Sequence, residues 1–354
     1  MSARARGEGR DRGRVRGRAR AWAELLRLPA LFTVPGDALV GAAATGLRPN
    51  RRTLLALTSS LCLYEAGMAL NDWADRAEDA VDRPERPIPS GRIAPAAALA
   101  AATALTGAGL AVAARAGRPA LAVATTLAAT VWAYDLGLKR TWAGPVAMGA
   151  ARGLDVVLGA AGTGSAARPV GSGGPARPVG SGGPALAVGT GSTAPPTGAG
   201  SATLPVRRAL PAAAAMAVHT LAVTAVSRRE TQGGSSAPPL AALATTAALA
   251  QLIGRGGPPE RPAGTPGRIT TLGTRPALRE ALAAGYAATA ARPLFHAALN
   301  PSPPLTQRAV GGGIRALIPL QAALCARAGA PRTALFAAAL APAARKFAKK
   351  VSVT

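Results

Sequence analysis

The chain has 354 residues, of which 49% are hydrophobic and only 3% aromatic, and its formal net charge is +25. A soluble domain of this size normally packs its core with larger side chains, whereas Ala and Gly dominate this chain, as they do where helices approach closely in a bilayer. The positive charge is carried mainly by Arg, without interleaved aromatic residues or a nucleic-acid motif. Composition therefore excludes nucleic acid as the expected partner.

The N-terminal segment, residues 1–22, is a basic arm. Between positions 4 and 20 it carries eight arginines, opposed only by Glu8 and Asp11. Like charges repel, so the arm is predicted to be disordered. It lacks the cleavage pattern of a signal peptide and is typical of a cytoplasmic segment beside the first span, near anionic lipid. The remainder, 23–354, is predicted to be one membrane domain.

Long apolar stretches follow the arm. A helix needs about 20 predominantly apolar residues to cross the hydrocarbon core. The stretches that approach this length are 30–46, 54–70, 95–114, 119–136, 143–162, 209–226, 238–254, 279–299 and 309–326. They predict an all-α, polytopic bundle of about nine transmembrane helices.

Two of the later stretches are less regular. The eighth contains Arg279, Glu280 and Arg292, so a shorter or re-entrant helix stays open for it. Residues 331–344 are apolar but short, and they predict a partial helix before the basic tail.

A low-complexity loop, residues 163–208, separates the fifth and sixth stretches. Residues 168–176 read RPVGSGGPA, and residues 177–185 repeat this sequence. Such a segment buries too little apolar surface to offset its ordering entropy. It is predicted to be a flexible insertion without chemistry.

The alternation of spans predicts where the polar loops lie. With the N-terminus in the cytoplasm and the chain in the plasma membrane, the loops after the second, fourth and sixth spans share the cytoplasmic face. The positive-inside rule supports this orientation only in part, because Arg48, Arg51, Arg52, Arg115 and Arg118 would lie outside.

The strongest chemical signal is an acidic cluster at the end of the second span. On a helix, Asp72, Asp75 and Asp79 occupy one face through their i, i+3, i+7 spacing. Carboxylates that share a face repel one another unless a cation neutralises them. Hard Mg²⁺ favours such oxygen ligands together with substrate phosphates. The alternative is a solvated helix end whose partners are Arg76, Arg83 and Arg86.

This cluster, followed by Arg-Pro-Glu-Arg-Pro-Ile-Pro-Ser-Gly-Arg at 83–92, resembles the first aspartate motif of the UbiA superfamily of intramembrane prenyltransferases. Residues 26–37 look like the opening helix of that family, and 134–140 (YDLGLKR) resemble its Tyr-x-x-x-x-Lys-Arg element. The resemblance implies about nine helices around a central cavity, a Mg²⁺-bound prenyl diphosphate and a small acceptor that binds nearby.

The resemblance also implies roles for individual residues. Asp72, Asp75 and Asp79 would hold Mg²⁺ on the diphosphate, and Lys139 would neutralise the leaving group as the allylic bond breaks. The remaining candidates for diphosphate or substrate binding around these motifs are Asn71, Arg83, Arg86, Tyr134 and Arg140. For Lys139 and Arg140, a cytoplasmic helix anchor is the alternative.

Arg152 and Asp155 are charged residues inside the fifth span, where charge is costly. A buried ion pair between them and a contact of Arg152 with the substrate site both stay open.

The second aspartate motif of the family has no counterpart, because no Asp follows Asp155. In its place, His219, Thr224, Ser227 and Glu230 fall on one side of a helix and are predicted to face the cavity. Glu230 is then a substitute metal ligand, or Arg228 binds phosphate directly as a guanidinium fork. A solvated polar helix end is the third possibility.

In lacking this motif, the chain resembles a divergent, actinobacterial-looking branch of the superfamily that is related to a UbiA-like protein of secondary-metabolite export operons. Two functions therefore stay open. The first is Mg²⁺-dependent transfer of a prenyl group to a small acceptor. The second is a UbiA-type scaffold that binds a polyprenyl phosphate or metabolite, as in export.

Overall fold

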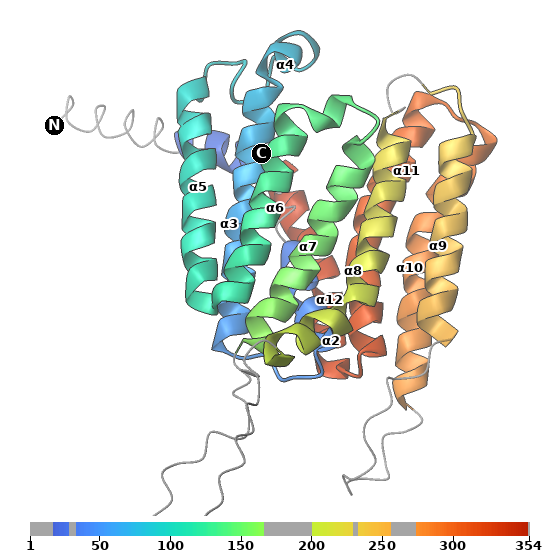
Figure 1. The fold of residues 1–354 in the computed structure, drawn as a ribbon. Coiled ribbons are helices and arrows are strands. Elements are labelled where there is room, and N and C mark those ends of the chain that lie inside the picture. Colours follow the sequence, from blue (N-terminus) through green and yellow to red (C-terminus); the bar gives the residue numbers. More distant parts are fainter. Residues whose placement is uncertain (1–16, 28–32, 166–199, 229–232, 256–273, 353–354) are drawn as a thin grey trace, which may run out of the picture.

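The computed structural model describes residues 17–27, 33–165, 200–228, 233–255 and 274–352 (Figure 1). Over these ranges the chain is helical and contains no strand. The long helices are α2 (Val34–Ala44), α3 (Arg51–Ala74), α5 (Pro95–Ala116), α6 (Arg118–Leu136), α7 (Gly144–Gly164), α8 (Gly200–Ser227), α9 (Ala237–Arg255), α10 (Thr274–Leu299), α11 (Pro303–Arg327) and α12 (Pro331–Ser352). Two short elements, α4 (Arg76–Asp82) and the 3-10 helix η2 (Leu138–Arg140), lie at one end of the bundle.

Each of the nine predicted stretches coincides with one of these helices. Within the described ranges, five helical segments are long and apolar enough to cross a membrane, namely Arg51–Ala74, Pro95–Ala116, Leu204–Ser227, Ala237–Arg255 and Pro303–Arg327. The all-α, multi-pass architecture is thus confirmed, while the number of nine crossings stays a prediction.

The structure differs from the sequence-based expectation at four places. The eighth stretch is one continuous helix of 26 residues, α10, and α12 extends beyond the predicted 331–344. Residues 17–25 are helical, with Ala21 and Leu25 fully buried, so the basic arm does not reach residue 22 as a disordered segment. The loop expected at 163–208 is also shorter, because α7 and α8 occupy its two ends. Residues 1–16 and 166–199, with the tandem repeat, lie outside the described part.

Proline marks where several helices begin. Helices α2, α5, α6, α7 and α11 carry Pro at one of their first two positions. Proline suits this place because the first N–H groups of a helix have no intrahelical partner and the ring presets a helical φ. Helix α3 uses a capping box instead, in which Asn50 and Thr53 bond each other's backbone N–H groups.

Helices α2 and α7 cross at glycine with their backbones in contact. A Cβ atom at Gly41 would lie 1.9 Å from the carbonyl oxygen of Val156, and one at Gly159 would lie 2.2 Å from that of Ala38. Small residues of this kind let helices approach closely in a membrane. This crossing holds α2, which carries the buried Asp37, beside α7.

Gly159→Ala is expected to lower the free energy of unfolding by about 1–3 kcal/mol, because the added methyl group overpacks a backbone contact. The matched control is Gly107→Ala in α5, where an added Cβ meets nothing within 4 Å. The control should be neutral or slightly stabilising, since Ala is the better helix former. Thermal unfolding in detergent measures both variants, and equal midpoints would contradict the assigned contact.

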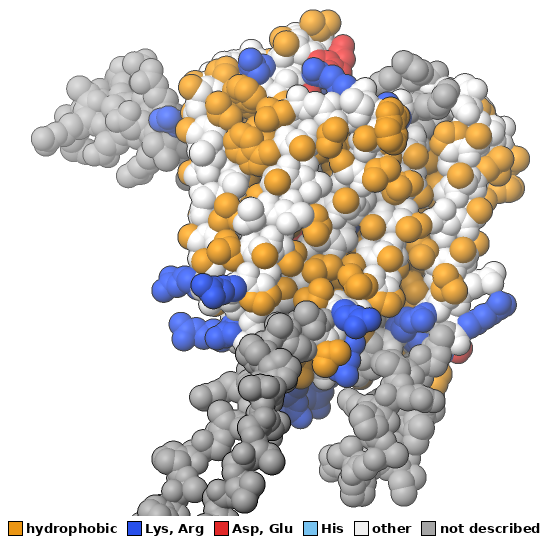
Figure 2. Space-filling model, viewed as in Figure 1, with side chains coloured by type: hydrophobic (Ala, Val, Ile, Leu, Met, Phe, Trp, Pro, Cys, Tyr) orange, Lys and Arg blue, Asp and Glu red, His pale blue; other side chains and the backbone are white. Residues whose placement is uncertain are grey.

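The surface separates into an apolar band and charged ends (Figure 2). Apolar side chains cover the middle of the helices, and Lys and Arg side chains gather at the end opposite α4. Exposed arginines that flank the α2–α3, α5–α6 and α7–α8 connections are Arg48, Arg51, Arg52, Arg115, Arg207 and Arg208. This distribution is that of a bundle whose middle lies in lipid.

Candidate active site

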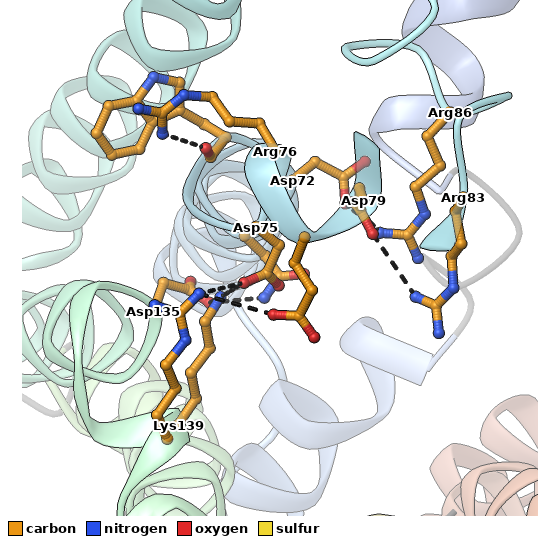
Figure 3. A network of polar contacts seen from close by, with 12 residues as sticks. Asp72, Asp75, Arg76, Asp79, Arg83, Arg86, Asp135 and Lys139 are labelled. Atoms are coloured by element: carbon orange, nitrogen blue, oxygen red, sulfur yellow. Dashed lines mark hydrogen bonds and ion pairs between the residues drawn. The ribbon is translucent and has the colours of Figure 1, made fainter. Parts of the chain in front are cut away.

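The acidic cluster lies where α3 gives way to α4. Asp75 joins the two helices with φ −89° and ψ 2°, so the chain changes direction at this residue. The expected single face of Asp72, Asp75 and Asp79 is therefore wrong, because the spacing rule assumes one continuous helix. Asp72 and Asp79 are drawn together, whereas Asp75 points to a different partner (Figure 3).

Asp72 and Asp79 are buried and share the guanidinium of Arg86. The Nη1 atom of Arg86 lies 2.6 Å from Asp79 Oδ2 and 3.6 Å from Asp72 Oδ1. Arg27 adds a contact of 3.2 Å to Asp72, and Arg83 one of 3.9 Å to Asp79. Three arginines thus converge on two carboxylates that are each only 4% exposed.

Asp75 faces the basic element that ends the fourth span. Lys139 Nζ lies 2.6 Å from Asp75 Oδ1 and 3.8 Å from Asp135 Oδ1. Arg140 lies 3.7 Å from both Asp75 and Glu78. The predicted meeting of the loops after the second and fourth spans is confirmed by these ion pairs, which tie Lys139 and Arg140 to the acidic cluster.

Asp135 belongs to this cluster but was not among the candidates predicted from the sequence. Its side chain is 5% exposed, and its Oδ1 accepts a hydrogen bond of 2.9 Å from Asn71 Nδ2. The signal was present in the sequence, since Asp135 ends an apolar stretch and precedes Lys139 by four residues, the spacing of a helical ion pair.

A cavity of about 950 Å³ extends from this cluster into the bundle. Arg27, Asn71, Tyr134 and Asp135 line its charged end. Much of the remaining wall is apolar and includes Leu63, Leu127, Val131, Leu317 and Ile318. The predicted central cavity therefore exists, and it connects the charged cluster with an apolar interior.

Arg152 forms a buried ion pair, as one prediction had it, but with a different partner, and it also lines the cavity. Its Nη1 atom lies 2.6 Å from Oδ2 of Asp37, a residue with no exposed surface. The other oxygen of Asp37 accepts a hydrogen bond of 2.7 Å from Gln321, which also donates to the carbonyl of Thr33. The ion pair expected with Asp155 is replaced by one that ties α7 to α2.

The polar stripe expected on α8 is present in its described part. His219, Thr224 and Ser227 line the cavity. His219 Nε2 lies 3.1 Å from the carbonyl oxygen of Gly313, so this nitrogen must carry the proton and donate it, and Nδ1 accepts from Tyr286 Oη at 3.0 Å. Both ring nitrogens are engaged, and His219 links α8, α10 and α11.

Of the other two candidates at the end of α8, only one is visible. Arg228 is exposed and donates a hydrogen bond to the carbonyl oxygen of Thr141, directly after Lys139 and Arg140. This contact brings the loop after the sixth span to the same end of the bundle, as predicted. Glu230 lies outside the described residues.

The donor set can be tested for a divalent metal. Asp72 and Asp79 provide adjacent carboxylate oxygens, which hard cations such as Mg²⁺ favour. Among the residues that the structure describes, no three His, Cys, Asp or Glu side chains converge on one point. The carboxylates of Asp72 and Asp79 face arginines instead, and that of Asp75 faces Lys139. The residues fit the metal by donor chemistry, with Asp72 and Asp79 as the adjacent pair.

The fold and the site define a class: a multi-pass helical membrane protein with an acidic and basic cluster at the mouth of an apolar cavity. The profile of the UbiA prenyltransferase family matches residues 30–255. The chain belongs to this family. Prenyltransferases of the family generally depend on a divalent metal.

Curated relatives match over part of their length. The digeranylgeranylglyceryl phosphate synthase of Methanothrix thermoacetophila is 39% identical over 119 residues, 33% of this chain and 44% of that protein. The synthase of Methanopyrus kandleri is 34% identical over 34% of this chain and 45% of that protein. The bacteriochlorophyll synthase 33 kDa chain of Rhodobacter capsulatus is 41% identical over 26% and 32%. The matched region spans less than half the length of these relatives.

Two solved structures share the fold. A structure reported for digeranylgeranylglyceryl phosphate synthase in membranes has a TM-score of 0.52 and 14% identity, covering 88% of this chain and 98% of that one. The apo UbiA homologue of Aeropyrum pernix K1 has a TM-score of 0.51 and 20% identity, covering 80% and 96%. The helical architecture is thus that of UbiA homologues over most of the chain.

Proposed function

We propose that this protein transfers a prenyl group from a prenyl diphosphate to a small acceptor at the charged end of its cavity. The observation that carries the proposal is the junction of two environments. A cluster with five cations, Arg27, Arg83, Arg86, Lys139 and Arg140, meets a largely apolar cavity of about 950 Å³. A prenyl diphosphate has the same division into an anionic head and an apolar tail.

The cations would bind the diphosphate head group and stabilise it as the leaving group. As the bond between C1 of the prenyl group and the bridging oxygen breaks, its electron pair and the negative charge move onto the diphosphate. Lys139, 11% exposed, and Arg140 would stabilise this charge, and fixed cations do so most strongly where water is scarce. The apolar walls at Leu127 and Val131 would hold the prenyl chain.

The acceptor would then form its bond to C1 and release a proton. Asp135 lines the cavity beside Asn71, and its carboxylate is a candidate in this cluster to receive that proton. Asp72, Asp75 and Asp79 are proposed to hold Mg²⁺, and the metal would supply charge neutralisation to the diphosphate when bound. Asn71, Tyr134, Arg152 and Arg228 are proposed to position substrate, as is Glu230 outside the described residues.

The membrane setting of the proposal follows the earlier expectation. We place the chain in the plasma membrane with residues 1–22 on the cytoplasmic side and 23–354 as the membrane domain. The acidic and basic cluster then faces the cytoplasm, where a soluble diphosphate product is released.

Diphosphate release by the purified protein in nanodiscs tests the function. Geranyl, farnesyl and geranylgeranyl diphosphates are offered with Mg²⁺ or EDTA, with and without a pool of aromatic and polyol acceptors. The expected result is Mg²⁺-dependent release, with a new prenylated product identified by its mass. Water serves as a surrogate acceptor, so prenyl alcohol reports bond cleavage even when the pool lacks the true acceptor. Tight binding of the diphosphates with no release and no alcohol would overturn the transferase and indicate a binding scaffold.

A further inference from the structure

The helix ends opposite α4 are rich in arginine and lack acidic residues from α2 to α8. The described segments 44–53, 113–120, 161–165 and 204–210 lie at the α2–α3, α5–α6 and α7–α8 connections and contain no Asp or Glu. Their arginines, all exposed and none in an ion pair within the described part of the chain, are Arg48, Arg51, Arg52, Arg115, Arg118, Arg207 and Arg208. Described carboxylates therefore leave this charge unneutralised.

Two of these connections meet at Ser165, the residue that follows α7. Arg52 at the beginning of α3 donates a hydrogen bond to the carbonyl oxygen of Ser165. A Cβ atom at Gly117 would lie 3.1 Å from the Ser165 hydroxyl oxygen, so the turn between α5 and α6 touches the same residue. Arg115 and Arg118 flank this glycine. Arg52, Arg115 and Arg118, from distant parts of the sequence, thus form one arginine corner.

The arginine corner holds its cations differently from the charged mouth of the cavity. At the mouth, Arg86 and Lys139 each contact a carboxylate oxygen at 2.6 Å. At the corner, the partner of Arg52 is a neutral carbonyl oxygen, which leaves the charge and most of the five N–H donors of the guanidinium unused. The corner is therefore available to an anion, at the end of the bundle opposite the mouth.

The arginine corner lies next to the surface that faces lipid. Figure 2 shows the Lys and Arg side chains of this end directly below the apolar band. Exposed Leu54 follows Arg52 by two residues, and exposed Leu204 and Leu210 flank the arginines at the beginning of α8 in the same way. An anion bound here can therefore continue into apolar chains that lie along the helices. A phospholipid has this division, whereas a soluble anion does not.

We propose that the arginine corner binds the headgroup of an anionic phospholipid, whose acyl chains lie along α3 and α5. A guanidinium donates two parallel hydrogen bonds to a phosphate, and an anionic headgroup adds no positive group that would repel the arginines. In the proposed orientation this end faces away from the cytoplasm, where the positive-inside rule disfavours arginine. Bound anionic lipid offsets that charge. The binding does not depend on prenyl transfer.

Native mass spectrometry of the full chain in detergent tests the site by counting bound lipids. Phosphatidylglycerol and phosphatidylcholine with the same acyl chains are titrated. The wild type should bind phosphatidylglycerol at least about tenfold more tightly, since each basic residue near anionic headgroups contributes about fivefold. Arg115→Gln with Arg118→Gln should lower this preference at least about fivefold, whereas Lys at both positions should keep most of it. The control is Arg292→Gln with Arg308→Gln, which removes two exposed arginines of α10 and α11.

The possible results lead to different conclusions. Equal binding of both lipids by the wild type, or an unchanged preference in the corner variant, would overturn the proposal. An equal loss in the control would overturn it as well, because net charge would then set the preference. Inorganic phosphate is compared with chloride at the same ionic strength, and stronger displacement of phosphatidylglycerol by phosphate would assign the corner to a soluble anion. A loss confined to the corner variant, with an unchanged unfolding temperature without lipid, supports the lipid site.

Discussion

Asp72→Asn and Asp75→Asn are each expected to lower prenyl transfer by about 10²-fold or more, the scale seen when a fixed group that stabilises developing charge is removed. Asp72 is the common partner of Arg27 and Arg86, and Asp75 is the main partner of Lys139. Each variant removes a proposed metal ligand and releases a cation from its position. Diphosphate release and product formation at saturating donor and Mg²⁺ measure the effect.

The control for these variants is Asp82→Asn. Asp82 is an exposed residue at the end of α4, and its substitution by Asn removes the same charge from the same segment. Its activity should stay near that of the wild type, and all three variants should insert in the membrane and unfold at similar temperatures. Wild-type turnover in Asp72→Asn and Asp75→Asn would remove these residues from the proposed site.

Arg152→Met is expected to cost about 3–5 kcal/mol of stability, because it leaves the carboxylate of Asp37 buried without its charged partner. Asp37 has no exposed surface, and the hydrogen bond from Gln321 would remain without a positive charge beside the carboxylate. Thermal unfolding in detergent should show a large loss. The double variant Asp37→Asn with Arg152→Met should recover most of it, since the uncompensated charge is then gone.

Arg207→Met provides the comparison for Arg152→Met. Arg207 is exposed at the beginning of α8, far from the buried pair. Its replacement should change stability by no more than about 0.5 kcal/mol, as is usual for surface positions. If the double variant were as unstable as Arg152→Met, the loss would come from missing packing of the long side chain instead of the buried charge.

The helices were predictable because apolar length alone identifies a membrane helix, and proline marks several of their beginnings. The three polar loops were also placed correctly on one end, since the direction of each span alternates. By contrast, α12 was predicted too short, because its C-terminal half is basic and lacks the apolar run by which the other helices were found.

Within the candidate site, residue types were predictable but pairings were not. The break at Asp75 depends on one backbone conformation, which helical spacing rules do not contain. The partner of Arg152 is 115 positions away, at Asp37, whereas the only ion-pair partner that the sequence suggested was its near neighbour Asp155. Contacts between distant segments follow from how helices pack, and a single sequence shows only the residues that such packing brings together.

The glycine contact between α2 and α7 also decides which wall of the cavity can admit a lipid-sized substrate. Two backbones that touch at Gly41 and Gly159 cannot part slightly, because any gap would forfeit contacts on both sides and expose carbonyls to hydrocarbon. The contact between α2 and α7 therefore forms a rigid part of the cavity wall. Sideways passage of a prenyl chain from the bilayer should therefore use another part of the cavity wall, where α10 and α12 present small side chains to the cavity.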